Sequence, residues 1–137
     1  MPDRVPAIKL LLLPKDTNAF GTIFGGVILS NIDLASAVEA RKTAPHRYVT
    51  RAMHEVEFHE PVHLGDIVSF YTETVRVGRT SITVRVSVEA ERWGSVPDGG
   101  GATRLGELVK VTEAVVVLVA VNDRGQPVPI RPEPLKA

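Results

Sequence analysis

The chain has 137 residues, equal numbers of acidic and basic side chains, and no cysteine. This length suits a single domain over residues 1–137, with a core at about residues 7–125, and a chain of this size buries roughly two thirds of its unfolded surface. A net charge of zero provides no general attraction for nucleic acid or an anionic membrane, so we expect neither as a partner. The lack of cysteine excludes disulfides and thiolate metal sites, and it suits the reducing cytoplasm.

Targeting and membrane segments are not expected. The apolar run at residues 8–13 is short and is interrupted by Lys9, so it does not resemble a signal peptide. The longest nearly uncharged stretch, residues 17–38, contains Asp33 and several glycines, which a membrane span rarely tolerates. We therefore expect a cytoplasmic protein.

The first two expected elements are a strand and a long helix. A strand over residues 7–13 ends at Pro14, because proline cannot donate to a strand ladder. Residues 27–44 carry apolar side chains at helical spacing in two adjoining rows, so we expect a helix that is buried around most of its circumference. Pro45 ends this helix.

Four strands are expected after the helix, at residues 49–59, 67–77, 82–91 and 109–121. Their short connections predict antiparallel pairing between consecutive strands. A glycine-rich loop over residues 94–106 interrupts them, and a proline-rich tail over residues 126–137 is expected to lie extended on the surface. A helix that is apolar on nearly every side, followed by a sheet, predicts an α+β fold in which the sheet curls around the helix.

Asp33 is the most unusual residue of the expected helix. It is the only charged residue between Asp16 and Glu39, and its neighbours along the helix face are apolar or small. Burying an unpaired carboxylate costs on the order of several kcal/mol, so Asp33 should be paired, be protonated and neutral, or have a role in function. Two interpretations stay open: a carboxylate that is hydrogen-bonded or exposed at the helix edge, and a desolvated general base.

Two short segments are candidates for ligand binding. Gly25 and Gly26 stand at the helix start, where unpaired backbone N–H groups form either an oxyanion hole or an ordinary cap. Arg79, Thr80 and Ser81 occupy a tight connection between two strands. One arginine with two hydroxyls suits a phosphate group, although the same residues suit an ordinary hairpin turn.

Metal chemistry and a serine nucleophile are not expected. His54 and His59 are separated by an odd number of residues, so on a strand they point to opposite faces. No second group of acidic or histidine residues has ligand spacing, and there is no Gly-x-Ser-x-Gly motif. We expect neither a metal nor another cofactor.

Taken together, the motifs resemble a known family. Residues 16–26, DTNAFGTIFGG, followed by Ile28-Leu29-Ser30 and Ile32-Asp33, resemble the signature of bacterial broad-specificity acyl-CoA thioesterases of the YciA type and of the two-domain animal acyl-CoA hydrolases. The similarity continues through residues 58–66, residues 77–81, the valine-rich last strand and residues 121–125. It spans about residues 7–130.

The resemblance implies a hotdog fold, in which a strongly curved antiparallel sheet wraps around one long central helix. It implies hydrolysis of acyl-CoA to a fatty acid and CoA without a metal or prosthetic group. It also implies dimers with a continuous sheet, commonly assembled into a hexamer as a trimer of dimers.

The resemblance also assigns roles to residues. Asp33 is the expected catalytic carboxylate, acting as general base or nucleophile, and Asn18 is its expected partner across the dimer interface. Gly25 and Gly26 are expected to contact the thioester carbonyl. The residues expected along the CoA path are those of the hairpin: Arg79, Thr80 and Ser81.

Two alternative functions stay open for this fold. An acyl-thioester hydratase would use a histidine with an acid, but the helix and its preceding loop contain no histidine. A non-catalytic acyl-CoA-binding or sensing protein is the second alternative. Release of free thiol from acyl-CoA separates either alternative from a thioesterase.

Overall fold

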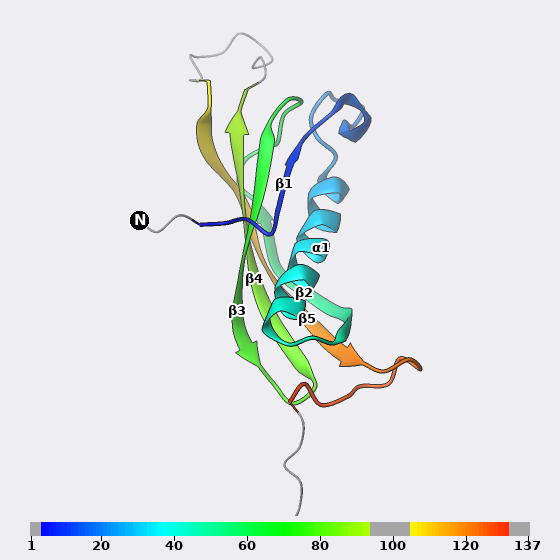
Figure 1. Cartoon of the computed structure of the whole chain (residues 1–137). Coiled ribbons are helices and arrows are strands. Elements are labelled where there is room, and N and C mark those ends of the chain that lie inside the picture. Colours follow the sequence, from blue (N-terminus) through cyan, green and yellow to red (C-terminus); the bar gives the residue numbers. More distant parts are fainter. Residues whose placement is uncertain (1–3, 94–104, 132–137) are drawn as a thin grey trace, which may run out of the picture.

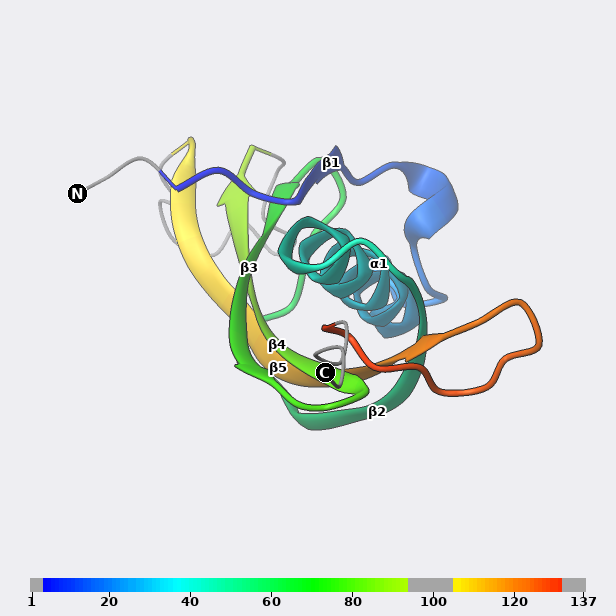
Figure 2. The ribbon, with the colours of Figure 1, turned by 60° about the horizontal axis from the view of Figure 1, so that its bottom comes forward.

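The structure is a computed structural model that describes residues 4–93 and 105–131. One long helix, α1 (Gly25–Thr43), packs against one antiparallel sheet, and a short 3-10 turn, η1 (Pro14–Asp16), precedes the helix (Figure 1). The strands of the sheet are β1 (Ile8–Leu11), β2 (Arg47–Phe58), β3 (Ile67–Val77), β4 (Ser81–Arg92) and β5 (Glu107–Val121). The sheet curls around α1 (Figure 2), which confirms the expected α+β architecture.

The order of the strands in the sheet is β1-β3-β4-β5-β2. Pairing of consecutive strands was expected throughout, and it is correct for β3 with β4 and for β4 with β5. It is wrong for β2 with β3. Residues 59–66 carry the chain past the start of α1, from the edge formed by β2 toward the opposite edge of the sheet, where β3 lies next to β1. β2 pairs with β5 instead and forms one edge of the sheet.

The ends of the elements agree with the expected ends to within two residues. The helix begins at Gly25 rather than at residue 27, so both glycines lie in its first turn. It ends at Thr43, and the N–H of the following Ala44 donates to the carbonyl of Ala40, 2.9 Å away. The expected helix end before Pro45 is therefore confirmed.

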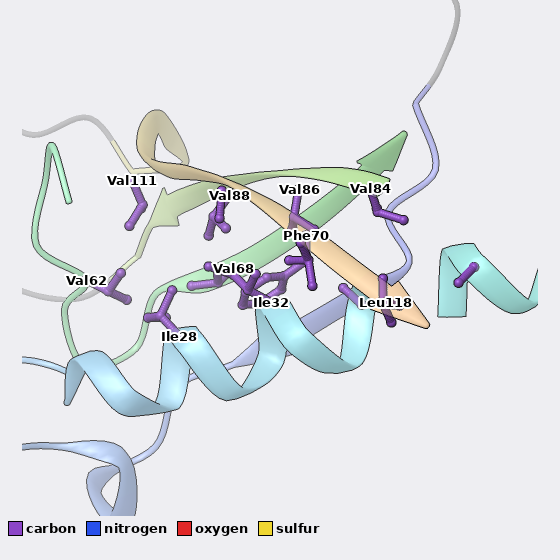
Figure 3. Packing of buried hydrophobic residues seen from close by; sticks show 14 of the residues in the cluster. Ile28, Ile32, Val62, Val68, Phe70, Val84, Val86, Val88, Val111 and Leu118 are labelled. Atoms are coloured by element: carbon purple, nitrogen blue, oxygen red, sulfur yellow. The ribbon is translucent and has the colours of Figure 1, made fainter. Parts of the chain in front are cut away.

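The core lies between one face of α1 and the concave face of the sheet. Figure 3 shows Ile28 and Ile32 pointing from α1 toward the valines of the strands and toward Phe70. All of these side chains are buried. The opposite face of α1 is open in the single chain, where Leu34 is 58% exposed and Val38 is 41% exposed. Burial around most of the helix is therefore wrong for one chain, because the sheet covers only one side.

The tail also departs from expectation. Val128 donates its N–H to the carbonyl of Ala120 at 2.9 Å, and Ile130 donates to the carbonyl of Arg79 at 2.8 Å. The side chain of Ile130 is buried in the core cluster, so this part of the tail does not lie extended on the surface. Residues 132–137 and most of the expected loop at 94–106 lie outside the described residues. In the described ranges, no helix is long and apolar enough to cross a membrane.

Candidate active site

The loop before α1 is organised by the side chain of Asn18. Its Oδ1 accepts hydrogen bonds from the backbone N–H groups of Phe20 at 2.8 Å and Thr22 at 3.2 Å. Its Nδ2 donates to the hydroxyl of Thr22 at 2.9 Å. An amide nitrogen carries two hydrogens, and no second acceptor for Nδ2 lies among the described residues. Asn18 is therefore fixed in its own loop and keeps one donor for another group.

The helix start has no side-chain cap. Phe24 is the N-cap residue, and its side chain cannot accept a hydrogen bond from the first turn. The amides of Gly25 and Gly26 belong to that turn, where N–H groups have no acceptor inside the helix. A Cβ atom at Gly26 would overlap the exposed ring of Phe24, so any other residue at this position requires that ring to move. The two amides, with the positive end of the helix dipole, suit a developing negative charge.

A hollow of about 290 Å³ opens beside Gly25. Most of its lining is apolar, contributed by Ile23, Ile28, Phe58, Pro61 and Val62, and His59 and Glu60 complete the rim. An apolar hollow next to unpaired backbone donors is the expected form of a site that holds a carbonyl with a hydrocarbon attached.

A buried ion pair supports the wall of this hollow. Arg92 on β4 donates to Oδ2 of Asp66, and it also donates to the carbonyl of Pro61 at 2.7 Å. Oδ2 of Asp66 accepts the N–H of His63 at 2.8 Å as well. Burial, helped by the nearby Arg92 charge, lowers the pKa of His63 below its ordinary value. The loop over residues 59–66 is thus tied to the rigid sheet.

This wall also contacts the loop of Asn18. The N–H of Ile23 donates to the carbonyl of Val62 at 2.9 Å, and Thr22 forms a bridge with His63. Asn18, the first turn of α1 and residues 59–66 therefore form one connected structure.

Asp33 lies elsewhere on α1. Its Oδ1 accepts a hydrogen bond from the hydroxyl of Thr50 on β2, the edge strand of the sheet. The carboxylate is partly exposed rather than enclosed in the core. Asp33 follows Gly25 by eight residues, which places its backbone about 12 Å farther along the helix. One thioester therefore cannot meet the first-turn amides and Asp33 of the same chain.

Arg79, Thr80 and Ser81 lie at the opposite end of the molecule from Gly25, in and next to the β3–β4 hairpin (Figure 1). The N–H of Gly78 donates to the carbonyl of Ser81 at 2.7 Å, and the carbonyl of Thr80 accepts from Ala120 at 2.8 Å. These residues do form a tight hairpin, as expected. In one chain, however, the expected site is divided into three places: the helix start, the middle of α1 and this hairpin.

Thr50 and Phe58 contribute to these places and were missed by reasoning from the sequence. Thr50 has no spacing signal, because its contact with Asp33 depends on how β2 passes the helix. Phe58 belongs to the motif segment 58–66, but nothing in the sequence alone indicated that its side chain lines a hollow. Among the described residues, no group of three or more histidine or acidic side chains is arranged to hold a metal ion.

Comparisons with known proteins identify the family of this chain. Residues 20–94 match the family model described as Thioesterase superfamily. The chain is 37% identical over 123 residues to the acyl-CoA thioester hydrolase YciA of Salmonella typhimurium, covering 90% of this chain and 87% of that protein.

Two solved structures extend the comparison. A hexameric hotdog fold thioesterase of Campylobacter jejuni is 47% identical with a TM-score of 0.80, covering 92% of this chain and 90% of that one. An acyl-CoA hydrolase of Staphylococcus aureus, solved with butyryl coenzyme A and coenzyme A, is 27% identical with a TM-score of 0.74. The match covers 90% of this chain and 69% of that one. This chain thus belongs to the thioesterase superfamily, with a hotdog fold, and within it to the acyl-CoA thioester hydrolases of the YciA type.

Proposed function

We propose that this protein hydrolyses acyl-CoA thioesters to a carboxylic acid and free CoA. The observation that carries the proposal is the helix start, where the unpaired amides of Gly25 and Gly26 adjoin an apolar hollow. A thioester needs both features, because its carbonyl oxygen becomes negative in the transition state and its acyl chain is apolar. Membership of the acyl-CoA thioester hydrolases supports the same reaction.

In the proposed mechanism, the thioester oxygen accepts hydrogen bonds from the amides of Gly25 and Gly26. Asp33 either removes a proton from water, whose oxygen then attacks the carbonyl carbon, or attacks that carbon itself to give an anhydride that water opens. In both routes the C–S bond breaks, and the thiolate of CoA takes up one proton. Asn18 uses its remaining Nδ2 hydrogen to orient the water or the carbonyl.

We propose further that each site combines two copies of the chain. Asp33 is too far along α1 to serve the first turn of its own helix, and it lies beside the edge strand β2. A second copy that pairs along β2 would bring its own helix start toward this carboxylate. The exposed apolar side chains near this edge support such a contact, and they include Leu34, Val38, Val49 and Phe58. A hexamer of three such dimers is the proposed assembly, as in the similar thioesterase of Campylobacter jejuni.

Arg79, Thr80 and Ser81 are proposed to contact the CoA part of the substrate. The exposed arginine lies at a hairpin tip whose backbone accepts hydrogen bonds from the N–H groups of Ala120 on β5 and of Ile130. We also propose a cytoplasmic location, supported by the absence of cysteine. Cell fractionation tests the location.

The direct test of the function is release of free thiol from a panel of acyl-CoAs of increasing chain length. Thiol release well above the uncatalysed rate, and lost in Asp33→Asn, is the expected result. Binding of acyl-CoA without thiol release would instead favour an acyl-CoA sensor. Addition of water across an enoyl thioester would favour a hydratase.

A further inference from the structure

Phe58, the last residue of β2, forms a wall of the apolar hollow beside the first turn of α1. A Cβ atom at Gly25 would lie 3.9 Å from Cζ of the Phe58 ring, which is ordinary van der Waals contact. The space between this ring and the backbone of Gly25 is therefore about one methylene group wide. It adjoins the amides that are proposed to hold the thioester carbonyl.

An extra residue in β2 decides which side chain faces the hollow. From the pair of His54 with Val115 to the pair of Glu57 with Glu113, β2 advances by three residues where β5 advances by two. Because successive side chains of a strand alternate between its faces, β2 without this bulge would turn Phe58 to the face of His54. It would turn the carboxylate of Glu57 toward the hollow instead.

The backbone of Glu55 accommodates the extra residue. Its φ angle is 56°, and no other non-glycine residue in the described ranges has a positive φ. This left-handed conformation is unfavourable for residues that carry a Cβ atom, and most unfavourable for β-branched ones. The side chain of Glu55 is exposed, so a substitution here acts through the backbone. Strain of this kind persists only where the surrounding structure fixes it.

A buried hydroxyl fixes the strand after the bulge. Thr112 on β5 is fully buried, and its hydroxyl donates to the carbonyl of Glu57. On the other side of Phe58, the N–H of His59 donates to the carbonyl of Val111 at 2.8 Å. Both neighbours of Phe58 are thus tied to the central strand β5, which fixes the backbone that carries the ring.

We propose that Phe58 selects acyl groups without a branch next to the thioester carbonyl, and that Glu55 and Thr112 are positioning residues that hold its ring in place. The inference rests on the proposed function and names the substrate class of that site. A straight chain is about one methylene thick and passes between Gly25 and the ring. A methyl branch at C2 needs the space that the ring occupies.

Pairs of isomeric substrates test the selection: butyryl-CoA with isobutyryl-CoA, and hexanoyl-CoA with 2-methylpentanoyl-CoA. For the wild type we expect kcat/KM to be at least about 10-fold higher for the straight isomer, after division by the rates of uncatalysed hydrolysis. Phe58→Ala should reduce this preference below about threefold, mainly by raising kcat/KM for the branched isomer. Phe58→Tyr keeps the ring and should preserve the preference.

The positioning residues should move the same ratio without contacting the substrate. Thr112→Val keeps the volume and loses the hydroxyl, and Glu55→Val places a β-branched residue in the left-handed conformation. Each should lower the preference at least about threefold, whereas Thr112→Ser and Glu55→Gly should preserve it. Arg51→Val is the matched control, because Arg51 lies at the other register shift of β2, between Thr50 and Ala52, and does not line the hollow. It should leave the preference unchanged.

Equal corrected rates for the two isomers in the wild type, or an unchanged preference in Phe58→Ala, would overturn selection by the ring. Phe58→Leu supplies the same comparison if Phe58→Ala does not fold. A preference that survives Thr112→Val and Glu55→Val, or that Arg51→Val lowers equally, would overturn the positioning roles. Hydrolysis of both isomers without discrimination contradicts only this inference. No thiol release from any of the four substrates contradicts the proposed function, and this inference with it.

Discussion

Among the described residues, the side-chain carboxylate of Asp33 has one hydrogen-bond partner, the hydroxyl of Thr50. We predict that Asp33→Asn lowers kcat about 10²- to 10⁴-fold, the contribution of a positioned acid or base, without changing the assembly or the thermal unfolding temperature. Thr50→Val keeps the shape of residue 50 and removes only the donor, so it should cost much less activity. Activity of Asp33→Asn within threefold of wild type would remove this carboxylate from the mechanism.

Arg79 is predicted to act on binding of the nucleotide end rather than on chemistry. Arg79→Ala should raise KM for acyl-CoA at least several-fold more than KM for an acyl thioester that lacks the nucleotide, because only the former carries phosphates. Arg124, an exposed arginine in the turn after β5, supplies the control variant Arg124→Ala. Equal effects of Arg79→Ala on both substrates would mean that Arg79 is only a turn residue.

At the scale of elements, Glu39 joins α1 to β3. Its carboxylate accepts hydrogen bonds from Thr72 at 2.9 Å and from Thr74 at 2.8 Å. Burial alone would raise the pKa of Glu39, but the hydrogen bonds from Thr74 and Thr72, with the Lys42 charge, outweigh it and lower the pKa. A pKa that is lower in the folded state means that ionised Glu39 stabilises the fold above the unfolded pKa.

This contribution is lost as the pH falls through the folded-state pKa of Glu39. We therefore predict that Glu39→Gln lowers the free energy of unfolding at pH 7 and that the difference from wild type shrinks below pH ~4.3, the ordinary pKa of glutamate. Urea unfolding over a pH series measures it, with exposed Glu107→Gln as the control. A difference that stays constant down to pH 3 would show that the carboxylate charge contributes nothing.

The loop over residues 59–66 depends on the buried pair of Asp66 and Arg92. Removing one partner leaves the other charge buried, so Arg92→Ala should cost about 3–5 kcal/mol of unfolding free energy. Replacing both partners by apolar residues of similar volume should cost less, because neither charge remains. Urea unfolding of the single and double variants measures both, and a single variant within 1 kcal/mol of wild type would contradict the account.

The sequence predicts where helices and strands begin and end better than it predicts which of them lie side by side. Alternation of apolar and polar residues predicts β4 closely, and helical spacing with Pro45 predicts the end of α1. The place of β2 beside β5 is not predictable in this way, because it depends on the path of residues 59–66 across the molecule. For the same reason the contact between Thr50 and Asp33 appears only in the structure.

At the scale of the whole molecule, the residues of the proposed site are divided among separate places in the single chain. The residues proposed from the sequence lie at the helix start, mid-helix and the far hairpin, and the exposed Leu34 and Val38 leave one face of α1 uncovered. Composition and periodicity describe one chain and predict none of this division. Only the family resemblance indicated that Asn18 and Asp33 come from different copies, and that pairing is still a prediction.

The most direct test of the shared site mixes two inactive variants, Asn18→Ala and Asp33→Ala. In a two-fold dimer with shared sites, a mixed dimer has one site with both substitutions and one with neither. Equal mixing makes about half of the dimers mixed, so the activity should recover to about a quarter of wild type. Because Asn18 also holds its own loop, Asn18→Asp, which keeps the Oδ1 acceptor and loses the Nδ2 donor, should complement Asp33→Ala equally well. No recovery, with exchange of subunits verified by native mass spectrometry, would place both residues in the site of one chain and contradict the account.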